Sequence, residues 1–243
     1  MKILVVGGGG REHAIVWKIA QSPKVDKIYC APGNGGIAEL AECVDIAATD
    51  IENMVKFAKD NAIDLVMVAP DDPLVLGMVD AMEKEGIRAF GPRANAAIIE
   101  GSKAFSKELM KKYNIPTANY EVFTDSTSAI DYIKAQNTFP TVIKADGLAL
   151  GKGVIIAQNL EEAEQAVHEM IDDGKFGKSG SRVVIEEFLT GPEVSVLAFT
   201  DGKTVKPMVS AQDHKRAYDN DEGLNTGGMG TFSPSRLYDD AKA

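Results

Sequence analysis

Residues 141–155 constrain the fold of this chain more than any other segment. A β-branched, apolar run leads into Lys144, a loop interrupted by glycines follows, and a second apolar run starts at Val154. Two apolar runs around a glycine-containing loop predict a strand, a reversal of direction and a returning strand. The sequence therefore predicts an antiparallel hairpin that carries a lysine into its loop.

The loop of this predicted hairpin is suited to binding an anion. Gly147, Gly151 and Gly153 let backbone N–H groups approach an anion without interference from a Cβ atom. Lys144 and Lys152 supply positive charge for phosphate oxygens. A Walker A loop is excluded, because that motif opens a helix and places serine or threonine directly after its lysine. We therefore expect a hairpin loop to hold the phosphates of a nucleotide.

The composition is that of an ordinary globular protein whose ligands are small molecules. The 243 residues are 44% hydrophobic and 26% charged, which suits one large or two smaller compact units. A formal net charge of −10 argues against nucleic acid or an anionic membrane as the main partner. No apolar run is long enough to span a bilayer, and no signal-peptide pattern follows Met1. Cys30 and Cys43 form no metal-binding spacing, and we expect reduced thiols in a cytoplasmic protein.

The first hundred residues alternate between strand and helix patterns. Strands are predicted at 3–6, 27–30, 64–68 and 87–90, and helices at 12–20, 51–62 and 74–85. This alternation indicates a Rossmann-like parallel sheet, with ligands at the carboxyl ends of its strands.

After Gly101 the pattern changes to a mixed order of strands and helices. Ser102 is a suitable N-cap for a helix that continues to Lys112. Around the hairpin, strands are predicted at 120–123, 182–189, 194–199 and 205–208, and helices at 126–135 and 160–171. The chain therefore divides into a parallel-sheet half and a half built around the hairpin.

Four glycines at 7–10 lie between the first strand and the first helix, where a helix N-terminus can bind a phosphate. The dinucleotide-binding pattern is incomplete, because Glu12 stands where its third glycine belongs. The second strand also ends at Pro32 without an acidic residue for a ribose. A single phosphate or carboxylate is the favoured ligand, a tight turn without a ligand is the plain alternative, and a nicotinamide oxidoreductase is a further one.

Two other segments gain meaning beside the lysine hairpin. Lys103 directly follows the predicted helix cap, and together with Lys144 and Lys152 it could neutralise a triphosphate. The apolar strand that ends at Glu186 and Glu187 could present backbone groups to a purine, and carboxylates to an amine or to ribose hydroxyls. The plain alternative for each segment is a solvated, charged surface.

These elements, in this order, resemble the ATP-grasp superfamily. Within it, the chain is similar to the phosphoribosylamine–glycine ligase family, whose members are also called glycinamide ribonucleotide synthetases. The motifs that carry the similarity extend to about Pro234, and they are Gly-Gly-Arg-Glu-His-Ala (9–14), Ala-Pro-Gly-Asn (31–34), Gly-Pro (91–92), Glu-Gly-Ser-Lys (100–103), Lys-Ala-Asp-Gly-Leu-Ala (144–149), Gln-Asp-His-Lys-Arg (212–216) and Asn-Thr-Gly-Gly-Met-Gly (225–230).

The resemblance implies an α/β protein in which a Rossmann-like domain is followed by an ATP-grasp α+β domain. The expected parts are a Rossmann-like domain (1–100), a linker helix (101–120), a lid subdomain (121–190) and the start of a second ATP-grasp subdomain (191–243). The implied reaction joins glycine to 5-phosphoribosylamine with ATP, through glycyl phosphate, and gives glycinamide ribonucleotide, ADP and phosphate. The implied cofactors are ATP and Mg²⁺ or Mn²⁺, and we expect a monomer.

The resemblance also implies roles for individual residues. Catalytic roles fall on Lys103, Lys144 and Lys152. The expected ATP-binding residues are Lys103, Lys144, Gly147, Gly151, Lys152, Gly153, Glu186, Glu187, Phe188, Leu189 and Glu193. The expected substrate-binding residues are Gly9, Gly10, Asp71, Asp213, Lys215, Asn225, Thr226, Gly227, Gly228, Met229 and Gly230. For residues 213–230, the alternative is a solvated loop followed by a turn.

The chain departs from the family pattern in two places. Asp71 stands where the family usually has glutamate, which shortens the reach of the carboxylate by one methylene group. The family also continues beyond residue 243, and its later segment carries the metal ligands. The chain therefore resembles the amino-terminal part of the enzyme, with no metal ligands of its own and little or no expected ligase activity. The alternatives are an ATP-binding fragment without catalysis and another ATP-grasp carboxylate–amine ligase.

Overall fold

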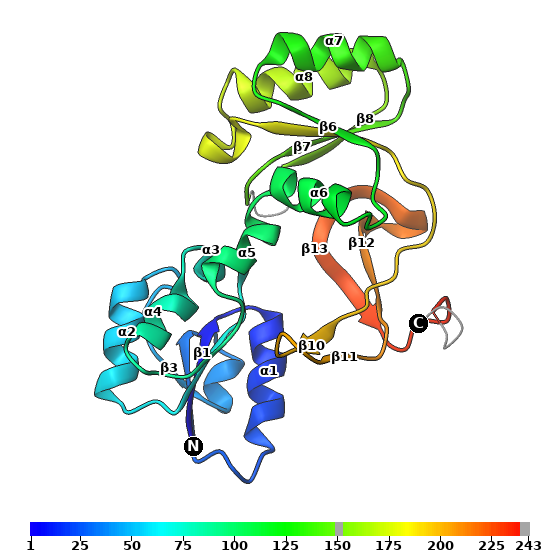
Figure 1. The fold of residues 1–243 in the computed structure, drawn as a ribbon. Helices are drawn as coiled ribbons and strands as arrows, with labels where there is room; N and C mark the ends of the chain where they lie inside the picture. The colour runs from blue at the N-terminus through cyan, green and yellow to red at the C-terminus, as the bar shows by residue number, and fades with distance from the viewer. Residues whose placement is uncertain (149–152, 239–243) are drawn as a thin grey trace.

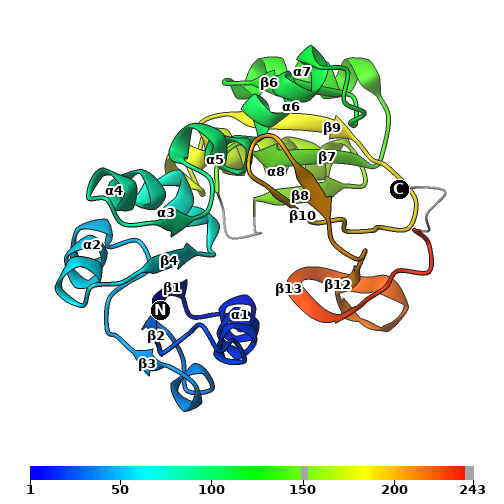
Figure 2. The same cartoon turned by 60° about the horizontal axis from the view of Figure 1, so that its bottom comes forward.

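The structure is a computed structural model that describes residues 1–148 and 153–238. An amino-terminal sheet with its helices forms one end of the molecule, and a second sheet with two covering helices forms the other (Figure 1). Two helices lie between these ends, and the last strands run along one side (Figures 1 and 2). Within the described ranges, no helix combines the length and the apolar character that crossing a membrane requires.

The amino-terminal sheet is parallel throughout and has the strand order β3-β2-β1-β4-β5. Its strands are β1 (Lys2–Gly7), β2 (Lys27–Pro32), β3 (Glu42–Cys43), β4 (Leu65–Val68) and β5 (Ala89–Phe90). Its helices are α1 (Gly10–Ala20), η1 (Ile37–Glu39), α2 (Ile51–Asp60), α3 (Asp71–Val75) and α4 (Met78–Lys84). This order, with β1 at the centre, confirms the predicted Rossmann-like sheet.

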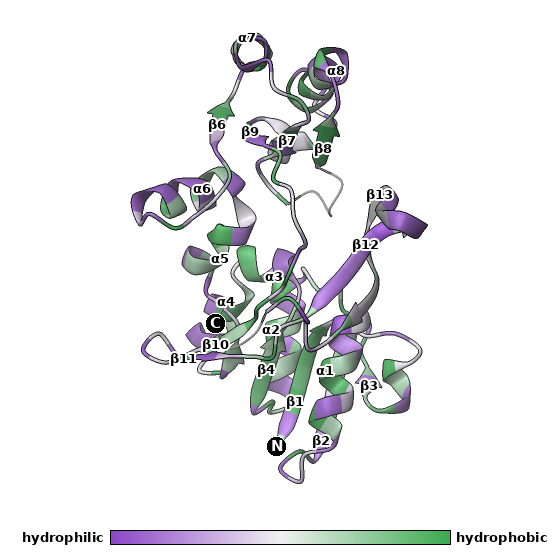
Figure 3. Ribbon diagram, turned by 90° about the vertical axis from the view of Figure 1, so that its right-hand side faces the viewer, coloured by the Kyte–Doolittle hydropathy of each residue, from purple (hydrophilic) through white to green (hydrophobic). Residues whose placement is uncertain are grey.

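Successive residues of β1 enter two separate cores, because the side chains of a strand alternate between its faces. Leu4 and Val6 pack with residues of α2 and α4. Ile3 and Val5 pack on the other face with residues of α1 and η1. Helices therefore cover both faces, which explains why β1 is a continuous apolar run, as the hydropathy colours of Figure 3 show.

The single helix predicted at 74–85 is wrong, because two helices occupy this stretch. Helix α3 ends at Val75 and α4 begins at Met78. Gly77 between them has a φ of +90°, a left-handed conformation that an α-helix does not accommodate. The apolar spacing continues across the break, and the sequence pattern therefore does not reveal it.

Two helices join the sheets, namely α5 (Ala94–Gly101) and α6 (Lys103–Lys112). Ser102 separates them and caps α6, because its hydroxyl oxygen accepts the Phe105 N–H at 3.1 Å. The predicted cap is therefore confirmed. Helix α5 was not predicted, and it begins after Arg93 without a side-chain cap. Its end lies close to α3, because a Cβ atom at Gly101 would be 3.0 Å from the Val75 side chain.

The second sheet is antiparallel and has the strand order β6-β9-β7-β8. Its elements are β6 (Tyr120–Phe123), α7 (Ser126–Gln136), β7 (Thr141–Ala145), β8 (Val154–Ala157), α8 (Leu160–Ile171), η2 (Gly177–Gly180) and β9 (Val183–Glu187). Strands β7 and β8 form the predicted hairpin. Ile143 of β7 lies opposite Ile155 on β8 and Ile185 on β9, and these side chains pack in one core with α7 and α8.

The last described residues form two further hairpins. These are β10 (Ala198–Thr200) with β11 (Val205–Pro207), and β12 (Gln212–Tyr218) with β13 (Glu222–Phe232), the second pair being joined by η3 (Asp219–Asp221). The strand predicted at 194–199 is correct only at its end. The alternative of a solvated loop and turn at 213–230 is wrong. Charged residues on β12, which is hydrophilic in Figure 3, and glycines in β13 hide the strand pattern because both are rare in strands.

Candidate functional site

A cavity of about 510 Å³ opens where α6, β7 and β9 meet. Its wall includes Lys103 and Lys107 from α6, Lys144 from β7 and the buried Glu186 from β9. The exposed Leu189 adds an apolar side chain. A concave site with several convergent charged groups is suited to binding an anionic small molecule.

Glu186 connects two of these lysines. Lys144 Nζ lies 2.9 Å and Lys107 Nζ 3.0 Å from the same carboxylate oxygen, Oε2. The Glu186 side chain is 5% exposed, so its charge depends on these partners more than on water. Its other oxygen, Oε1, is buried and has no hydrogen-bond partner among the described residues. A hydrogen-bond donor of a ligand would be favoured at such an oxygen.

Lys103 links the start of α6 to the start of the hairpin loop. Its Nζ donates to Gly147 O at 2.9 Å. Burial lowers the pKa of the Lys103 amino group below its ordinary value, and the nearby Asp146 carboxylate opposes this shift. A bound anion would stabilise the charged form further, because an opposite charge favours it.

Asp146 holds the base of the loop in place. Its carboxylate accepts hydrogen bonds from Ser102 Oγ at 3.0 Å and from Ala104 N at 2.7 Å. Arg182 Nε donates to Asp146 Oδ2 at 2.9 Å, and Arg182 Nη2 forms an ion pair with the same oxygen. The buried carboxylate lies at the N-terminus of α6, where the helix dipole favours negative charge. It therefore ties together α6, the hairpin and the start of β9.

Two of the predicted loop glycines have defined surroundings. A Cβ atom at Gly147 would lie 2.4 Å from Ser179 Oγ, so a larger residue would force a rearrangement there. Gly153 O accepts a backbone hydrogen bond from the end of β7 at 2.8 Å. Gly151 and Lys152, which were predicted to bind ATP, lie outside the described residues.

Glu187, Phe188 and Leu189, which follow Glu186, have different surroundings. The Glu187 carboxylate accepts two hydrogen bonds from Asn119, one from the backbone N–H at 2.9 Å and one from Nδ2 at 3.1 Å. Phe188 and Leu189 are both partly exposed, and of these two Leu189 lines the cavity. The strand end therefore contributes Glu186 and Leu189 to the cavity.

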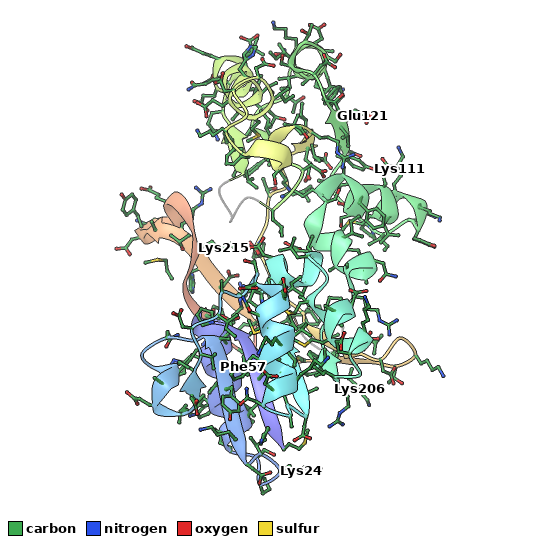
Figure 4. All side chains as sticks on the ribbon, turned by 90° about the vertical axis from the view of Figure 1, so that its left-hand side faces the viewer. Lys24, Phe57, Lys111, Glu121, Lys206 and Lys215 are labelled. Carbon is green, nitrogen blue, oxygen red and sulfur yellow. The ribbon has the colours of Figure 1, made fainter. Side chains whose placement is uncertain are left out.

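Glu193 lies further along the chain and pairs with β12. Lys215 Nζ forms an ion pair with Glu193, and Asp213 Oδ2 lies 4.0 Å from the same nitrogen. Figure 4 labels Lys215 on this strand. The structure thus brings one predicted ATP-binding residue together with two predicted substrate-binding residues.

The other predicted substrate-binding residues of the carboxyl-terminal half share one strand, β13. They are Asn225, Thr226, Gly227, Gly228, Met229 and Gly230. Thr226 Oγ1 donates to Lys215 O at 2.8 Å and accepts the Gly228 N–H at 3.1 Å. These hydrogen bonds hold β13 against the part of β12 that carries Lys215.

Three predicted substrate-binding residues lie at the carboxyl edge of the parallel sheet. Gly9 precedes α1 and Gly10 is its first residue, directly after β1. Asp71 is the first residue of α3, after the neighbouring strand β4. Glu12 is 4% exposed and accepts the Gly9 N–H at 2.6 Å, while its Oε1 has no hydrogen-bond partner within the described residues. This edge is the usual ligand position of such a sheet.

The sequence did not reveal the roles of Lys107, Asp146 and Arg182. Lys107 stands four residues after Lys103, and this spacing places both lysines on one face of a helix. That pattern is a signal from which Lys107 could have been found. Asp146 meets Ser102 from 44 residues away and Arg182 from 36 residues away, and no local pattern reveals such contacts.

The acidic side chains that line the cavity are Glu100 and Glu186. In residues 1–148 and 153–238, no group of three or more histidine, cysteine, aspartate or glutamate residues is arranged to hold a metal ion. We therefore assign no metal ligand within these ranges.

The fold, with its lysine-bearing hairpin over a cavity, is that of the ATP-grasp class. The chain shares it with the biotin carboxylase domain of the 2-oxoglutarate carboxylase from Hydrogenobacter thermophilus, a structure in complex with MgADP, ADP and bicarbonate. The TM-score is 0.73 at 17% identity, and the match covers 88% of this chain and 50% of that chain. At this identity, the likeness concerns the fold alone.

Comparison with protein families then gives the particular group. The model of the phosphoribosylglycinamide synthetase N domain matches residues 1–100, and the model of the ATP-grasp (A) domain of the same synthetase matches residues 101–242. The chain belongs to the phosphoribosylglycinamide synthetase family, which confirms the resemblance seen in its motifs.

Relatives named phosphoribosylamine–glycine ligase match nearly the whole chain. The protein from Halalkalibacterium halodurans is 54% identical over 242 residues, which are 100% of this chain and 56% of that protein. The protein from Haemophilus influenzae is 55% identical over 237 residues, 97% of this chain and 55% of that protein. The crystal structure of the ligase from Thermotoga maritima has a TM-score of 0.79 at 32% identity and covers 97% of this chain and 56% of its own. The chain thus spans about half the length of the curated relatives it matches.

Proposed function

We propose that this chain binds ATP in the cavity between α6, β7 and β9, as part of an enzyme that joins glycine to 5-phosphoribosylamine. The products would be glycinamide ribonucleotide, ADP and phosphate. The observation that carries the proposal is the convergence of Lys103 and Lys144 with the buried Glu186 on one cavity, in a chain of the phosphoribosylglycinamide synthetase family. A small-molecule anion fits this charge arrangement.

The chemistry requires an activated carboxylate. Oxide is a poor leaving group, and transfer of the γ-phosphoryl group to glycine would give glycyl phosphate, from which phosphate leaves when the amine attacks the carbonyl carbon. Such a reaction needs the protein chiefly for positioning and charge neutralisation. Lys103 and Lys144 would supply part of this neutralisation at the phosphates. Lys152 is proposed to share this role by family resemblance.

A divalent cation, Mg²⁺ or Mn²⁺, is proposed to accompany the nucleotide. When bound, it would neutralise charge on the β- and γ-phosphates. The fold neighbour from Hydrogenobacter thermophilus was solved with MgADP, which supports the choice of Mg²⁺. We propose no residue of this chain as a ligand of the ion.

The base of the nucleotide is proposed to lie against the end of β9. Leu189 offers an apolar surface, and Glu186 Oε1 is an acceptor without a partner among the described residues. Because Asn119 engages the Glu187 carboxylate, contacts from Glu187 would come from its backbone. Gly147, Gly151 and Gly153 are proposed to face the phosphates, Phe188 the base and Glu193 the ribose.

The phosphoribosylamine is proposed to bind at the carboxyl edge of the parallel sheet, and glycine beside the β12–β13 hairpin. Gly9 and Gly10 would meet the phosphoribosylamine, because they lie at a helix N-terminus on the ligand edge. Asp71 is proposed to contact the same substrate. The glycine and acyl-phosphate region is proposed to be lined by Asp213, Lys215, Asn225, Thr226, Gly227, Gly228, Met229 and Gly230. The proposed parts of the protein are 1–100, 101–120, 121–190 and 191–243, with the nucleotide between the second and third.

Replacing Lys144 tests the nucleotide site. Lys144→Ala should weaken ADP binding by about 1.5–3 kcal/mol, the size of a charge-assisted hydrogen bond. Isothermal titration calorimetry with ADP measures this difference directly. The control is Lys111→Ala, because Lys111 is an exposed lysine on α6 and is labelled in Figure 4. Unchanged affinity of a folded Lys144→Ala protein, as judged by circular dichroism, would remove Lys144 from the site.

The other candidate function is nucleotide binding without ligation. A coupled assay for ADP release, with glycine, 5-phosphoribosylamine and Mg²⁺, separates the two possibilities. Release of ADP that depends on both substrates supports the ligase. ADP binding without such release assigns this chain the binding role, with the ligase activity then belonging to a longer protein.

A further inference from the structure

Lys107 is a buried lysine that the proposed reaction does not use. It lies one turn after Lys103 on the same face of α6, and its side chain is 10% exposed. Two lysines four residues apart repel each other on an isolated helix, and a buried ammonium group is costly unless it is paired. The position is therefore favourable only because of what Lys107 contacts.

The Lys107 ammonium group has three polar partners. Its Nζ lies 3.0 Å from Glu186 Oε2, donates to Thr117 Oγ1 at 2.7 Å and donates to Ala118 O at 3.4 Å. The same nitrogen is 5.5 Å from the centre of the Tyr120 ring. Two of its three N–H donors therefore form hydrogen bonds within the protein, and the ion pair holds the charged group against Glu186. It is held in place rather than available for binding.

Lys144 differs from Lys107 although both meet the same oxygen. Within the described residues, Glu186 Oε2 at 2.9 Å is its hydrogen-bond partner, and its side chain is 26% exposed on the cavity wall. Two of its donors therefore remain for a ligand. If Lys144 moves to a phosphate, it leaves the Glu186 carboxylate in a site that is 5% exposed. A buried carboxylate without a partner is strongly unfavourable.

We propose that Lys107 is a positioning residue for the nucleotide phosphates. It remains on Glu186 when Lys144 turns to a phosphate, so that the carboxylate keeps a counter-charge throughout. Without Lys107, Lys144 is the one cationic partner of the Glu186 carboxylate among the described residues, and its transfer to a phosphate would leave that buried acid without a counter-charge. This inference rests on the proposed nucleotide site and adds to it a residue that does not touch the ligand.

The test separates phosphate binding from base binding. ADP and adenosine are titrated calorimetrically into the wild type, Lys107→Met and the exposed control Lys111→Met. Lys107→Met should weaken ADP binding by about tenfold or more, the scale of one charge-assisted contact. Adenosine has no phosphate, so its affinity should stay within about twofold of the wild type. Lys111→Met should leave both affinities unchanged.

A second pair of variants tests the link through Glu186. If Glu186 is made neutral, Lys107 has no acid to hold. Lys107→Met should therefore have little effect on ADP affinity when it is added to Glu186→Gln. Lys107→Gln, whose amide retains two donors for Thr117 and Ala118, replaces Lys107→Met if the methionine variant does not fold.

The outcomes are distinct. The proposal is supported if Lys107→Met weakens the binding of ADP but not of adenosine, and if the same substitution has little effect on ADP affinity when Glu186 is already glutamine. Equal losses for ADP and adenosine would show that Lys107 only maintains the shape of the site, and would overturn it. So would unchanged ADP affinity. A wild-type protein that binds adenosine and ADP equally weakly would refute the proposed nucleotide site itself, before any variant is compared.

Discussion

At the scale of single residues, burial determines the chemistry of Cys30. Its side chain is fully buried, and Sγ donates to Gly7 O at 3.3 Å. Burial raises the pKa of the Cys30 thiol to about 12, and the nearby Cys43 adds to the rise. The neutral thiol is thus part of the folded state, next to the end of β1 where the glycine-rich turn begins.

Alkaline pH should destabilise the protein through this thiol. Its ordinary pKa is 9.0 and its folded pKa is about 12, so between these values the folded state holds a proton that the unfolded chain has lost. The stabilisation is complete below pH 9 and declines as pH rises toward 12, by up to about 2 kcal/mol at pH 10.5. Urea unfolding at pH 8 and pH 10.5 measures the loss in the wild type and in Cys30→Ala.

Cys30→Ala should lose less free energy of unfolding than the wild type between pH 8 and pH 10.5. Cys43→Ala removes the smaller contribution to the raised pKa and leaves Cys30 buried, so it should lose nearly as much stability as the wild type. If Cys30→Ala and the wild type lose the same free energy of unfolding, Cys30 does not retain its proton as described.

The residues of the cavity differ in how far the sequence can reveal them. Lys103, Lys144 and Glu186 could be predicted because each lies in a contiguous motif with a recognisable order. The pairing of Lys107 with Glu186 could not, because these residues are far apart in the sequence and meet only when α6 lies against β9. Asp146 is similar, since its partners come from two other segments. Local pattern thus indicates candidate binding residues, and the fold determines which residues hold them in place.

At the scale of elements, backbone conformation decides where helices end. Gly77 separates α3 from α4 with a φ of +90°. The nearest heavy atom to a Cβ atom built there is 3.8 Å away, so space is available for a side chain. The requirement for glycine at this position therefore comes from the backbone rather than from crowding.

Substituting Gly77 should show how much the left-handed backbone conformation at this residue contributes to the free energy of unfolding. Gly77→Ala should lower the free energy of unfolding by about 1–2 kcal/mol, because a left-handed conformation is unfavourable for residues with a Cβ atom. Gly10→Ala is the matched control, since Gly10 lies in the first turn of α1 and has no atom within 4 Å of an added Cβ. It should be neutral or stabilising by up to about 1 kcal/mol. Chemical denaturation measures both, and effects of equal sign would contradict the explanation.

Elements with an unbroken pattern were predicted well, and those without one were not. The bounds of β6 and α8 agree with the residue ranges expected from the sequence. The β12–β13 hairpin was missed because it consists largely of charged residues and glycines, which are rare in strands. The pairing of the two strands with each other forms this hairpin, rather than the strand propensity of its residues. The break at Gly77 was missed because the spacing of apolar residues indicates where side chains lie and does not indicate the sign of the φ angle.

At the scale of the whole molecule, Asp146 joins the two sides of the proposed nucleotide site. The carboxylate receives hydrogen bonds from the start of α6 and from Arg182 ahead of β9. In addition, Lys103 N donates to Asp146 O at 2.9 Å. The helix that begins with Lys103 is therefore fixed to the end of β7, the strand that carries Lys144.

Removing this acid should destabilise the fold strongly. Asp146→Ala should lower the free energy of unfolding by about 2–4 kcal/mol, because it leaves the buried donors of Ser102 and Ala104, and the half-exposed Arg182, without their acceptor. Asp125→Ala is the control: Asp125 also caps a helix, accepting the Ser128 N–H at 2.8 Å, but is exposed. Its loss should be about 1 kcal/mol. Similar losses for both variants, measured by urea unfolding, would show that Asp146 is only a cap.

The lysine-lined cavity has a consequence for the rate at which a nucleotide arrives. Three lysines, Lys103, Lys107 and Lys144, outnumber the two acids in the lining of one cavity, in a chain whose net charge is −10. At 0.1 M salt, both the repulsion from the net charge and the attraction of the lysines are screened beyond about 10 Å, so a polyanion meets the repulsive surface before it reaches the cavity. Added salt weakens this repulsion and the final contacts alike. Ionic strength should therefore speed up capture of the nucleotide while it shortens the lifetime of the complex.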